Sequence, residues 1–222
     1  MRLPDLENYK NDSLFETVKI KDVPKIEPHI NILTDRDKVK FIKKIEQTVR
    51  SSMEYKEYIA FLRKYIDMTQ CSYFNNITKK DGAKVSIEIH HEPFTLFDIT
   101  QIILEKWIQN EQKLNPILIA EEVMKVHFQN KVGLIPLSIT VHDLVHMGKV
   151  FIPLQSVKGE FIEFLQEYEP YISQDLLDML EIKLSMSKDV AAQDTSILEK
   201  KYIYLEVDGM SFPQPLSDVI EK

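Results

Sequence analysis

The sequence predicts an α+β fold: a mainly helical single domain built around a small unit that contains strands. From residue 34 onward, apolar residues recur mostly at the three- and four-residue spacing of amphipathic helices. Only a few short segments alternate or run apolar in the way that strands do. The length of 222 residues, with 44% hydrophobic and 28% charged residues, is enough for one hydrophobic core with appendages.

For the first part of the chain, the sequence predicts an irregular N-terminal arm at 1–33, followed by an N-terminal helical segment at 34–70. The arm contains three prolines and shows no sustained periodicity. Thr34 is a typical helix cap, and Asp37 three residues later completes an approximate capping box. The helical spacing then continues to about residue 67, which predicts either one long helix or two.

The central part, 71–152, begins with a predicted hairpin. The pair Asp81-Gly82 favours a hairpin turn, because glycine readily adopts the positive φ that such turns need. We therefore expect one strand at about 71–77 and its partner at about 84–90.

A two-helix insertion is predicted at 95–130. The capping-box-like "TLFD" opens its first helix, and Asn115-Pro116 opens its second, with Asn as the cap and Pro in the first turn. After the insertion, "VGLIPLS" predicts a strand or an extended segment. "ITVHDLVH" then predicts a short helix ended by Gly148, and "VFIPL" is compatible with a further strand.

The last part, 153–222, is predicted as an acidic helical region with a late strand. Acidic amphipathic segments at about 159–168 and 173–186 predict helices, and "KYIYLEV" predicts the strand. Residues 159–222 hold five Lys/Arg against fourteen Asp/Glu, whereas residues 36–68 hold nine against five. This asymmetry is compatible with a phosphate-facing surface in the first half, or simply with a solvated basic helix face.

Overall composition narrows the class of protein. The net charge of −7 argues against a protein that coats DNA non-specifically, and the single cysteine, Cys71, excludes an internal disulfide. The longest apolar stretches are shorter than a membrane span, and "MRLPDLENYKND" lacks the apolar core of a secretion signal. We therefore expect no membrane association and a cytoplasmic location, which is the host cytoplasm if a phage encodes the chain.

Histidines concentrate in the central part of the chain. His142 and His146 are four residues apart on a predicted helix, so their side chains lie on one face, as in a two-point metal clamp. His90, at the end of a predicted strand, is a candidate third ligand, and such a site leaves coordination positions open. The neighbouring His91 is a candidate general base, because a neutral imidazole can take a proton from water.

These residues resemble the HNH, or ββα-metal, endonuclease superfamily. "EIHH" at a strand end, followed by "VGLIPLSITVHDLVH", is similar to its signature, in which a His pair precedes a Leu-Ile-Pro-Leu-like strand and an H-x-x-x-H helix. The resemblance covers about 71–152. It implies a ββα-metal unit with the 95–130 insertion, metal ligands at His90, His142 and His146, and one divalent ion, with Mg²⁺ or Zn²⁺ as first candidates. It also implies His91 as the general base.

The sequence departs from this signature where the family has an asparagine that orients the base. Gly133 occupies that position, and the nearby Asn130 is a candidate replacement. Glu88 shares the predicted strand face of His90 and is a candidate for orienting it. His127 is interpreted as helix core, or alternatively as a partner that orients a metal ligand.

Two functions follow as hypotheses. The first is a phage-encoded, metal-dependent endonuclease that hydrolyses DNA, in which His91 activates water and the metal stabilises the leaving oxyanion. Lys79, Lys80 and Lys84, which flank the predicted turn, are candidate phosphate contacts. The alternative is a catalytically degenerate HNH-like module that binds a protein partner, with the acidic C-terminal region as the candidate binding surface.

Overall fold

The computed structural model describes residues 34–74, 86–188, 202–207 and 210–215. The helical elements, in chain order, are α2 (Asp35–Ser51), α3 (Met53–Tyr65), α4 (Leu96–Gln109), α5 (Pro116–Phe128), α6 (Ile139–His146), η4 (Leu154–Ser156), α7 (Phe161–Tyr168), η5 (Glu169–Tyr171) and α8 (Gln174–Lys188). The strands are β1 (Ile87–His91), β2 (Leu134–Ser138), β3 (Tyr202–Val207) and β4 (Met210–Pro215). The mainly helical α+β character predicted from the sequence is confirmed.

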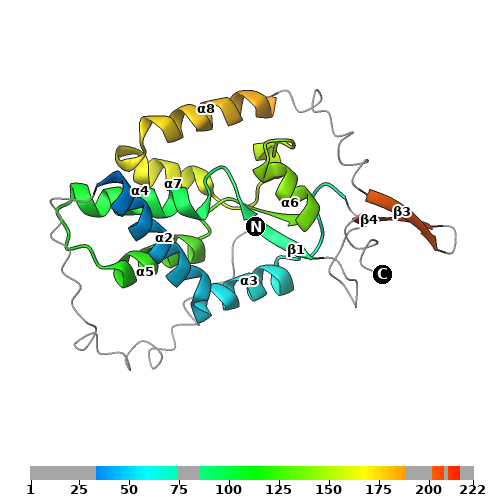
Figure 1. Cartoon of the computed structure of the whole chain (residues 1–222), viewed down its shortest axis with the longest axis horizontal. Coiled ribbons are helices and arrows are strands. Elements are labelled where there is room, and N and C mark those ends of the chain that lie inside the picture. The colour runs from blue at the N-terminus through cyan, green and yellow to red at the C-terminus, as the bar shows by residue number, and fades with distance from the viewer. Residues whose placement is uncertain (1–33, 75–85, 189–201, 208–209, 216–222) are drawn as a thin grey trace.

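The helical body consists of α2, α4 and α5 packed on one another, with α3 and α7 against them (Figure 1). Its core is built from the apolar stripes that the sequence shows, for example Ile42 and Ile45 on α2 and Ile102 and Ile103 on α4. The helical segment at 34–70 forms two helices rather than one. Ser52 separates them, since it ends α2 in an extended conformation and its hydroxyl caps α3.

The predicted helix starts are confirmed. The Thr34 hydroxyl accepts a hydrogen bond from the Asp37 amide, and Thr95 and Asp98 form a full capping box at the start of α4. The Asn115 side chain accepts from the amides at the start of α5. These caps satisfy amides that would otherwise lack partners in the first turn.

A carboxylate joins three helices of the body. Glu122 on α5 accepts hydrogen bonds from Lys106 Nζ at 2.6 Å and from Trp107 Nε1 at 2.6 Å, both on α4. Its carboxylate also accepts from the Tyr168 hydroxyl of α7 at 2.9 Å. Because these donors neutralise and solvate it, Glu122 fixes the two-helix insertion against the C-terminal region.

β1 and β2 form an antiparallel pair, with His90 opposite Ile135 and His91 opposite Leu134. The strand expected at 84–90 is thus present over its described part, but its partner is β2. Residues 71–74 form no strand, so that part of the predicted hairpin is wrong. They contribute instead a backbone bond from the Ser72 amide to the Pro136 carbonyl, at the other edge of β2.

α6 follows β2 without an intervening loop and packs on both strands. A second, smaller core lies between them and includes Ile135, Leu137, Val141 and Leu144. Gly148 has a φ of +65°, which is the left-handed conformation expected after a helix end. The chain order is therefore strand, two-helix insertion, strand and helix.

The strand proposed for "VFIPL" is not formed. Leu134 pairs with Lys158 through two 2.8 Å backbone bonds, and Ser72 takes the next position along the same edge of β2. With this edge occupied, residues 151–153 form no regular secondary structure before η4, while Val150 and Ile152 are buried in the smaller core.

The late strand of the acidic region is confirmed as β3, and β4, which the sequence did not predict, pairs with it antiparallel. The two acidic helices are confirmed as α7 and α8. The predicted arm at 1–33 and the turn at Asp81-Gly82 lie outside the described residues. Among the described residues, no helix is long and apolar enough to cross a membrane.

Candidate metal centre

Three imidazoles converge where α6 crosses the strand pair. One ligand atom from each of His90, His142 and His146 lies within 4.8 Å of the others. The ring centroid of His90 is 5.1 Å from that of His142 and 5.1 Å from that of His146. His90 is buried, His142 is half-buried and His146 is exposed. The cluster, called here the histidine triad, therefore opens to solvent on the His146 side.

Local structure explains this convergence. Alternation along β1 places Glu88 and His90 on the face that α6 covers. On α6, the four-residue spacing places His142 and His146 one above the other, with their Nε2 atoms 3.2 Å apart. Because α6 begins at the end of β2, the strand register fixes where both helix histidines meet His90.

The donor set suits a divalent transition metal. Tetrahedral zinc with Zn–N bonds of 2.0–2.1 Å has nitrogen ligands roughly 3.3 Å apart, close to the separation of the two helix Nε2 atoms. Imidazole nitrogens favour Zn²⁺ and its transition-metal neighbours, whereas Mg²⁺ prefers oxygen ligands. The three residues therefore fit Zn²⁺ better than Mg²⁺.

Glu88 contacts His142 rather than His90, the residue that the sequence suggested. Its Oε2 lies 3.1 Å from His142 Nδ1. A proton on Nδ1 faces this carboxylate, which leaves the Nε2 lone pair directed toward the triad, as in a carboxylate–histidine–metal arrangement. Burial lowers the pKa of His142, against the opposing effect of Glu88, and thus favours the neutral imidazole that binds metal.

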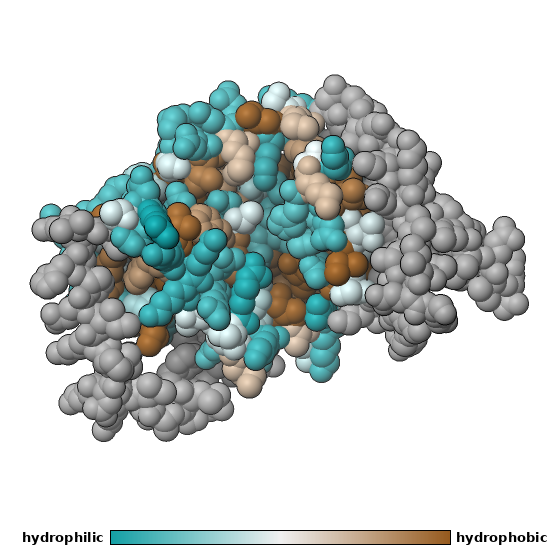
Figure 2. All heavy atoms as spheres, viewed as in Figure 1, coloured by the Kyte–Doolittle hydropathy of each residue, from teal (hydrophilic) through white to brown (hydrophobic). Residues whose placement is uncertain are grey.

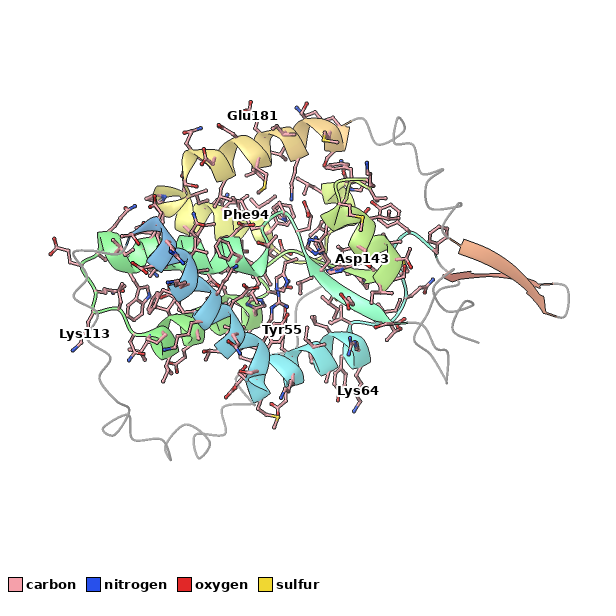
Figure 3. The ribbon with its side chains drawn as sticks, in the orientation of Figure 1. Tyr55, Lys64, Phe94, Lys113, Asp143 and Glu181 are labelled. Carbon is pink, nitrogen blue, oxygen red and sulfur yellow. The ribbon has the colours of Figure 1, made fainter. Side chains whose placement is uncertain are left out.

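His91 lies on the opposite face of β1, in the helical body. Its Nε2 is 2.9 Å from Nε2 of His127, and the His127 Nδ1 is 2.6 Å from the carbonyl oxygen of Val123. Nδ1 of His127 must donate to that carbonyl, so in the neutral pair its Nε2 accepts and His91 Nε2 donates. The rings of Tyr55 and Tyr58 pack edge-on against His127 (Tyr55 is labelled in Figure 3).

The environment of this pair opposes protonation. Burial, reinforced by His127, lowers the pKa of His91 well below its usual value. Burial likewise lowers the pKa of His127 to about 4, although the bond to Val123 acts in the other direction. Both histidines are therefore neutral at pH 7. His127 fits the core interpretation, and it contacts no residue of the triad.

Gly133 lies where the chain comes too close to Glu92 for a side chain. A Cβ atom at this position would be 1.9 Å from the Glu92 carbonyl oxygen and 2.7 Å from a methyl group of Val157. The Gly133 carbonyl accepts the Glu92 amide at 3.0 Å. An asparagine does not fit here. Asn130 has a φ of +58°, and its carbonyl accepts the Glu160 amide, so it shapes the turn after α5.

A lysine that the sequence analysis did not single out reaches the triad's edge. Lys183 of α8 pairs with Glu92, whose Oε2 lies 3.6 Å from His90 Nε2. Helical spacing indicates that Lys183 lies on the inner face of α8, because it stands between Leu180 and Ser187, both of which are buried. Lys79, Lys80 and Lys84 lie outside the described residues.

The fold and the triad define a mainly helical α+β protein with a candidate three-histidine metal centre. Residues 5–210 match the model of the family described as bacteriophage G278-like virion protein. Since the match spans most of the chain, the chain belongs to this family, and the expected phage association is confirmed. No curated protein and no solved structure matches the chain.

Proposed function

We propose that this chain binds one divalent metal ion, preferably Zn²⁺, through His90, His142 and His146, and that this centre belongs to an HNH-like DNA endonuclease. The observation that carries the proposal is the convergence of the three imidazoles within 4.8 Å. Since the family is one of virion proteins, we propose that the chain acts as a component of the phage particle. In this role the acidic C-terminal region would bind a protein partner.

The arrangement of elements supports the HNH-like part of the proposal. β1 ends in the His90-His91 pair and runs antiparallel to β2, and α6 with its H-x-x-x-H pair follows directly. This is the order strand, strand, helix of a ββα-metal unit. α4 and α5 separate the strands in sequence, and as a packed pair of helices they return the chain to the end of β1.

The open side of the triad supports hydrolysis. Three protein ligands leave coordination positions free, as in catalytic rather than structural metal sites. When bound, a divalent ion supplies positive charge that stabilises the oxyanion leaving the phosphodiester. His90, His142 and His146 would supply the imidazole nitrogens that hold the ion, and Glu88 keeps the His142 ring in one orientation.

His91 is the proposed general base, although it lies on the face of β1 opposite the triad. In the proposed role His91 accepts the water proton at Nδ1, because its Nε2 proton is donated to His127. Yet His91 is only 5% exposed. This burial specifically favours the second candidate function, in which the same metal centre stabilises a non-catalytic module of the virion.

Two measurements test the proposals. The metal content of purified protein should be about one Zn²⁺ per chain, and His142→Ala should remove it. Supercoiled plasmid incubated with the protein and Zn²⁺, Mg²⁺, Mn²⁺ or Ni²⁺ should be nicked, and His91→Gln should abolish nicking without loss of metal. Bound metal with intact plasmid under every ion would leave the non-catalytic module. A folded wild-type protein without metal would overturn the centre itself.

A further inference from the structure

Glu92 is a buried carboxylate at the exit of β1 that the proposed ligand set does not use. It is 4% exposed. Its two oxygens face different partners: Oε2 is 3.6 Å from Nε2 of His90, and Oε1 is 2.5 Å from Nζ of Lys183. A buried carboxylate without a partner is strongly unfavourable, and the Lys183 ammonium supplies that partner beside His90.

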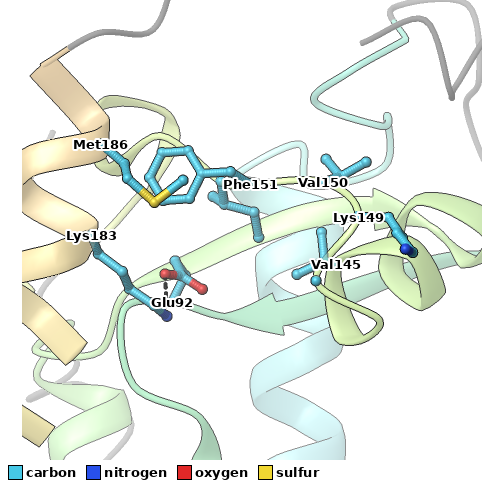
Figure 4. A pocket seen from close by; sticks show the side chains of 9 residues that line it. Glu92, Val145, Lys149, Val150, Phe151, Lys183 and Met186 are labelled. Atoms are coloured by element: carbon cyan, nitrogen blue, oxygen red, sulfur yellow. Dashed lines mark ion pairs between the residues drawn. The ribbon is translucent and has the colours of Figure 1, made fainter. Parts of the chain in front are cut away.

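Lys183 reaches this position from α8, far away in the sequence. Its Nζ also donates to the Pro93 carbonyl at 2.8 Å, so one ammonium holds both residues that follow β1. A cavity of about 430 Å³ lies here, lined by Glu92, Lys183, Val145 of α6 and the segment 148–152. Figure 4 shows the ion pair between Lys183 and Glu92 within this cavity.

The helical pattern shows that Lys183 is an exception on its own helix. α8 carries acidic residues at its solvent side, such as Glu181, and buries Leu180 and Ser187. Ser187 fixes the end of the helix, since its hydroxyl accepts the Leu154 amide at 3.0 Å. Lys183 stands on this inner face, where an apolar residue would ordinarily pack. The ion pair with Glu92 explains why a lysine occupies this position.

We propose that Glu92 is a positioning residue for His90 and that Lys183 holds Glu92, so that docking of α8 and metal binding at the triad stabilise each other. This inference rests on the proposed metal centre. At 3.6 Å the carboxylate is in ion-pair range of the ring but beyond a hydrogen bond, so it acts through its charge and by restricting ring rotation. Carboxylates that contact ligating imidazoles support metal affinity in this way.

The first test compares Zn²⁺ affinities in competition with a chromophoric chelator. Lys183→Met keeps the aliphatic stem and removes the ammonium, and it should weaken Zn²⁺ binding about tenfold. Lys188→Met, the same change on the same helix without this contact, should stay within about twofold of the wild type. Lys183→Arg should restore most of the affinity, because a guanidinium can still pair with Glu92.

A double variant separates positioning from general destabilisation. Glu92→Gln should also weaken Zn²⁺ binding about tenfold. If Lys183 acts through Glu92, the double variant Glu92→Gln/Lys183→Met binds no more weakly than Glu92→Gln alone. Additive losses would overturn the inference, and so would equal affinities of Lys183→Met and Lys188→Met.

Coupling to α8 has a readout of its own. Because linkage is reciprocal, Zn²⁺ should slow hydrogen exchange of the α8 amides in the wild type and in Lys188→Met, but much less in Lys183→Met. The visible spectrum of the Co²⁺-loaded protein should change in Glu92→Gln, since it reports the geometry of the ligands. Wild-type protein that binds no Zn²⁺ overturns the proposed centre together with this inference. Protein that binds Zn²⁺ tightly without cleaving DNA overturns only the nuclease.

Discussion

The two faces of β1 give neighbouring histidines contrasting surroundings. His90 and His91 are nearly equally buried, at 7% and 5% exposure, so burial alone does not tell them apart. Their partners do. His90 faces two imidazoles of α6 and the Glu92 carboxylate, at the edge of an open cluster. His91 faces the neutral ring of His127 inside the helical body.

The two faces also differ in the groups that surround each histidine. On the α6 face, ring nitrogens converge, and the carboxylates of Glu88 and Glu92 lie beside them. On the opposite face, the imidazoles of His91 and His127 pair with each other, and the rings of Tyr55 and Tyr58 pack edge-on against His127. Figure 2 shows polar and apolar side chains interspersed over the viewed surface. The contrast between His90 and His91 is one of interior contacts, because both are buried.

Removing one histidine from each face of β1 should have two different consequences. We expect His142→Ala to reduce bound Zn²⁺ from about one ion per chain to nearly none, with an affinity loss beyond the roughly 10–100-fold of outer contacts. His127→Gln should keep the metal and lose stability instead. Elemental analysis and urea denaturation of both variants measure this, and metal loss in His127→Gln would show that the faces are not independent.

Gly133→Ala tests the close approach between Gly133 and Glu92 at the end of the strand pair. Gly133→Ala places a Cβ 1.9 Å from the Glu92 carbonyl, which cannot move without disturbing both faces. We expect the free energy of unfolding to fall by about 3 kcal/mol or more. Gly148→Ala is the matched control. Its Cβ meets nothing within 4 Å, and only its φ of +65° opposes alanine, so about 1 kcal/mol is expected. Equal effects in urea denaturation would contradict the close approach.

Local signals predicted most of the helical body. Capping residues such as Thr95 and Asn115, together with regular apolar spacing, act over a few residues and are visible in the sequence. The strand pairing was not predictable in the same way. A turn signal at Asp81-Gly82 suggested a local hairpin. Instead, β1 pairs with β2, more than forty residues further along the chain.

The candidate site was likewise predictable only where local spacing determines it. Spacing on one helix placed His142 beside His146, and strand alternation placed His90 and Glu88 on one face. Which histidine Glu88 contacts depends on how α6 crosses the strands, and Lys183 arrives from a helix beyond the motif. Such contacts between distant segments depend on tertiary packing, which spacing alone does not encode.

Acid should destabilise the fold through the buried histidine pair of the helical body. The pKa of His127 is about 4 in the folded chain, against a usual value of 6.5 in the unfolded chain. Above pH 6.5 the residue is neutral in both states and has no effect. Between pH 6.5 and 4 only the unfolded chain takes up the proton, so stability falls by about 3 kcal/mol.

The measurement is urea denaturation across this pH range with chelator present, so that metal release does not contribute. His127→Gln keeps an acceptor for His91 but cannot titrate, and its stability should fall less steeply with acid. His91 acts in the same direction, because its pKa is also lowered by burial. An equal pH dependence in wild type and variant would mean that His127 is accessible to protons in the folded state.

The smallest expected effect concerns the carboxylate at the open side of the triad. Glu88 is 40% exposed in its side chain and contacts His142 Nδ1 at 3.1 Å, so water screens part of its charge. Glu88→Ala should weaken Zn²⁺ binding by about tenfold, the lower end of the range for such contacts. Glu88→Gln retains an oxygen that can accept a hydrogen bond from the Nδ1 proton. Its Zn²⁺ affinity should lie between those of Glu88→Ala and the wild type. If Glu88→Ala and Glu88→Gln weaken Zn²⁺ binding equally, Glu88 supports the affinity through its charge and not by orienting the His142 ring. If both match the wild type in chelator competition, the orientation of His142 is set by α6 alone.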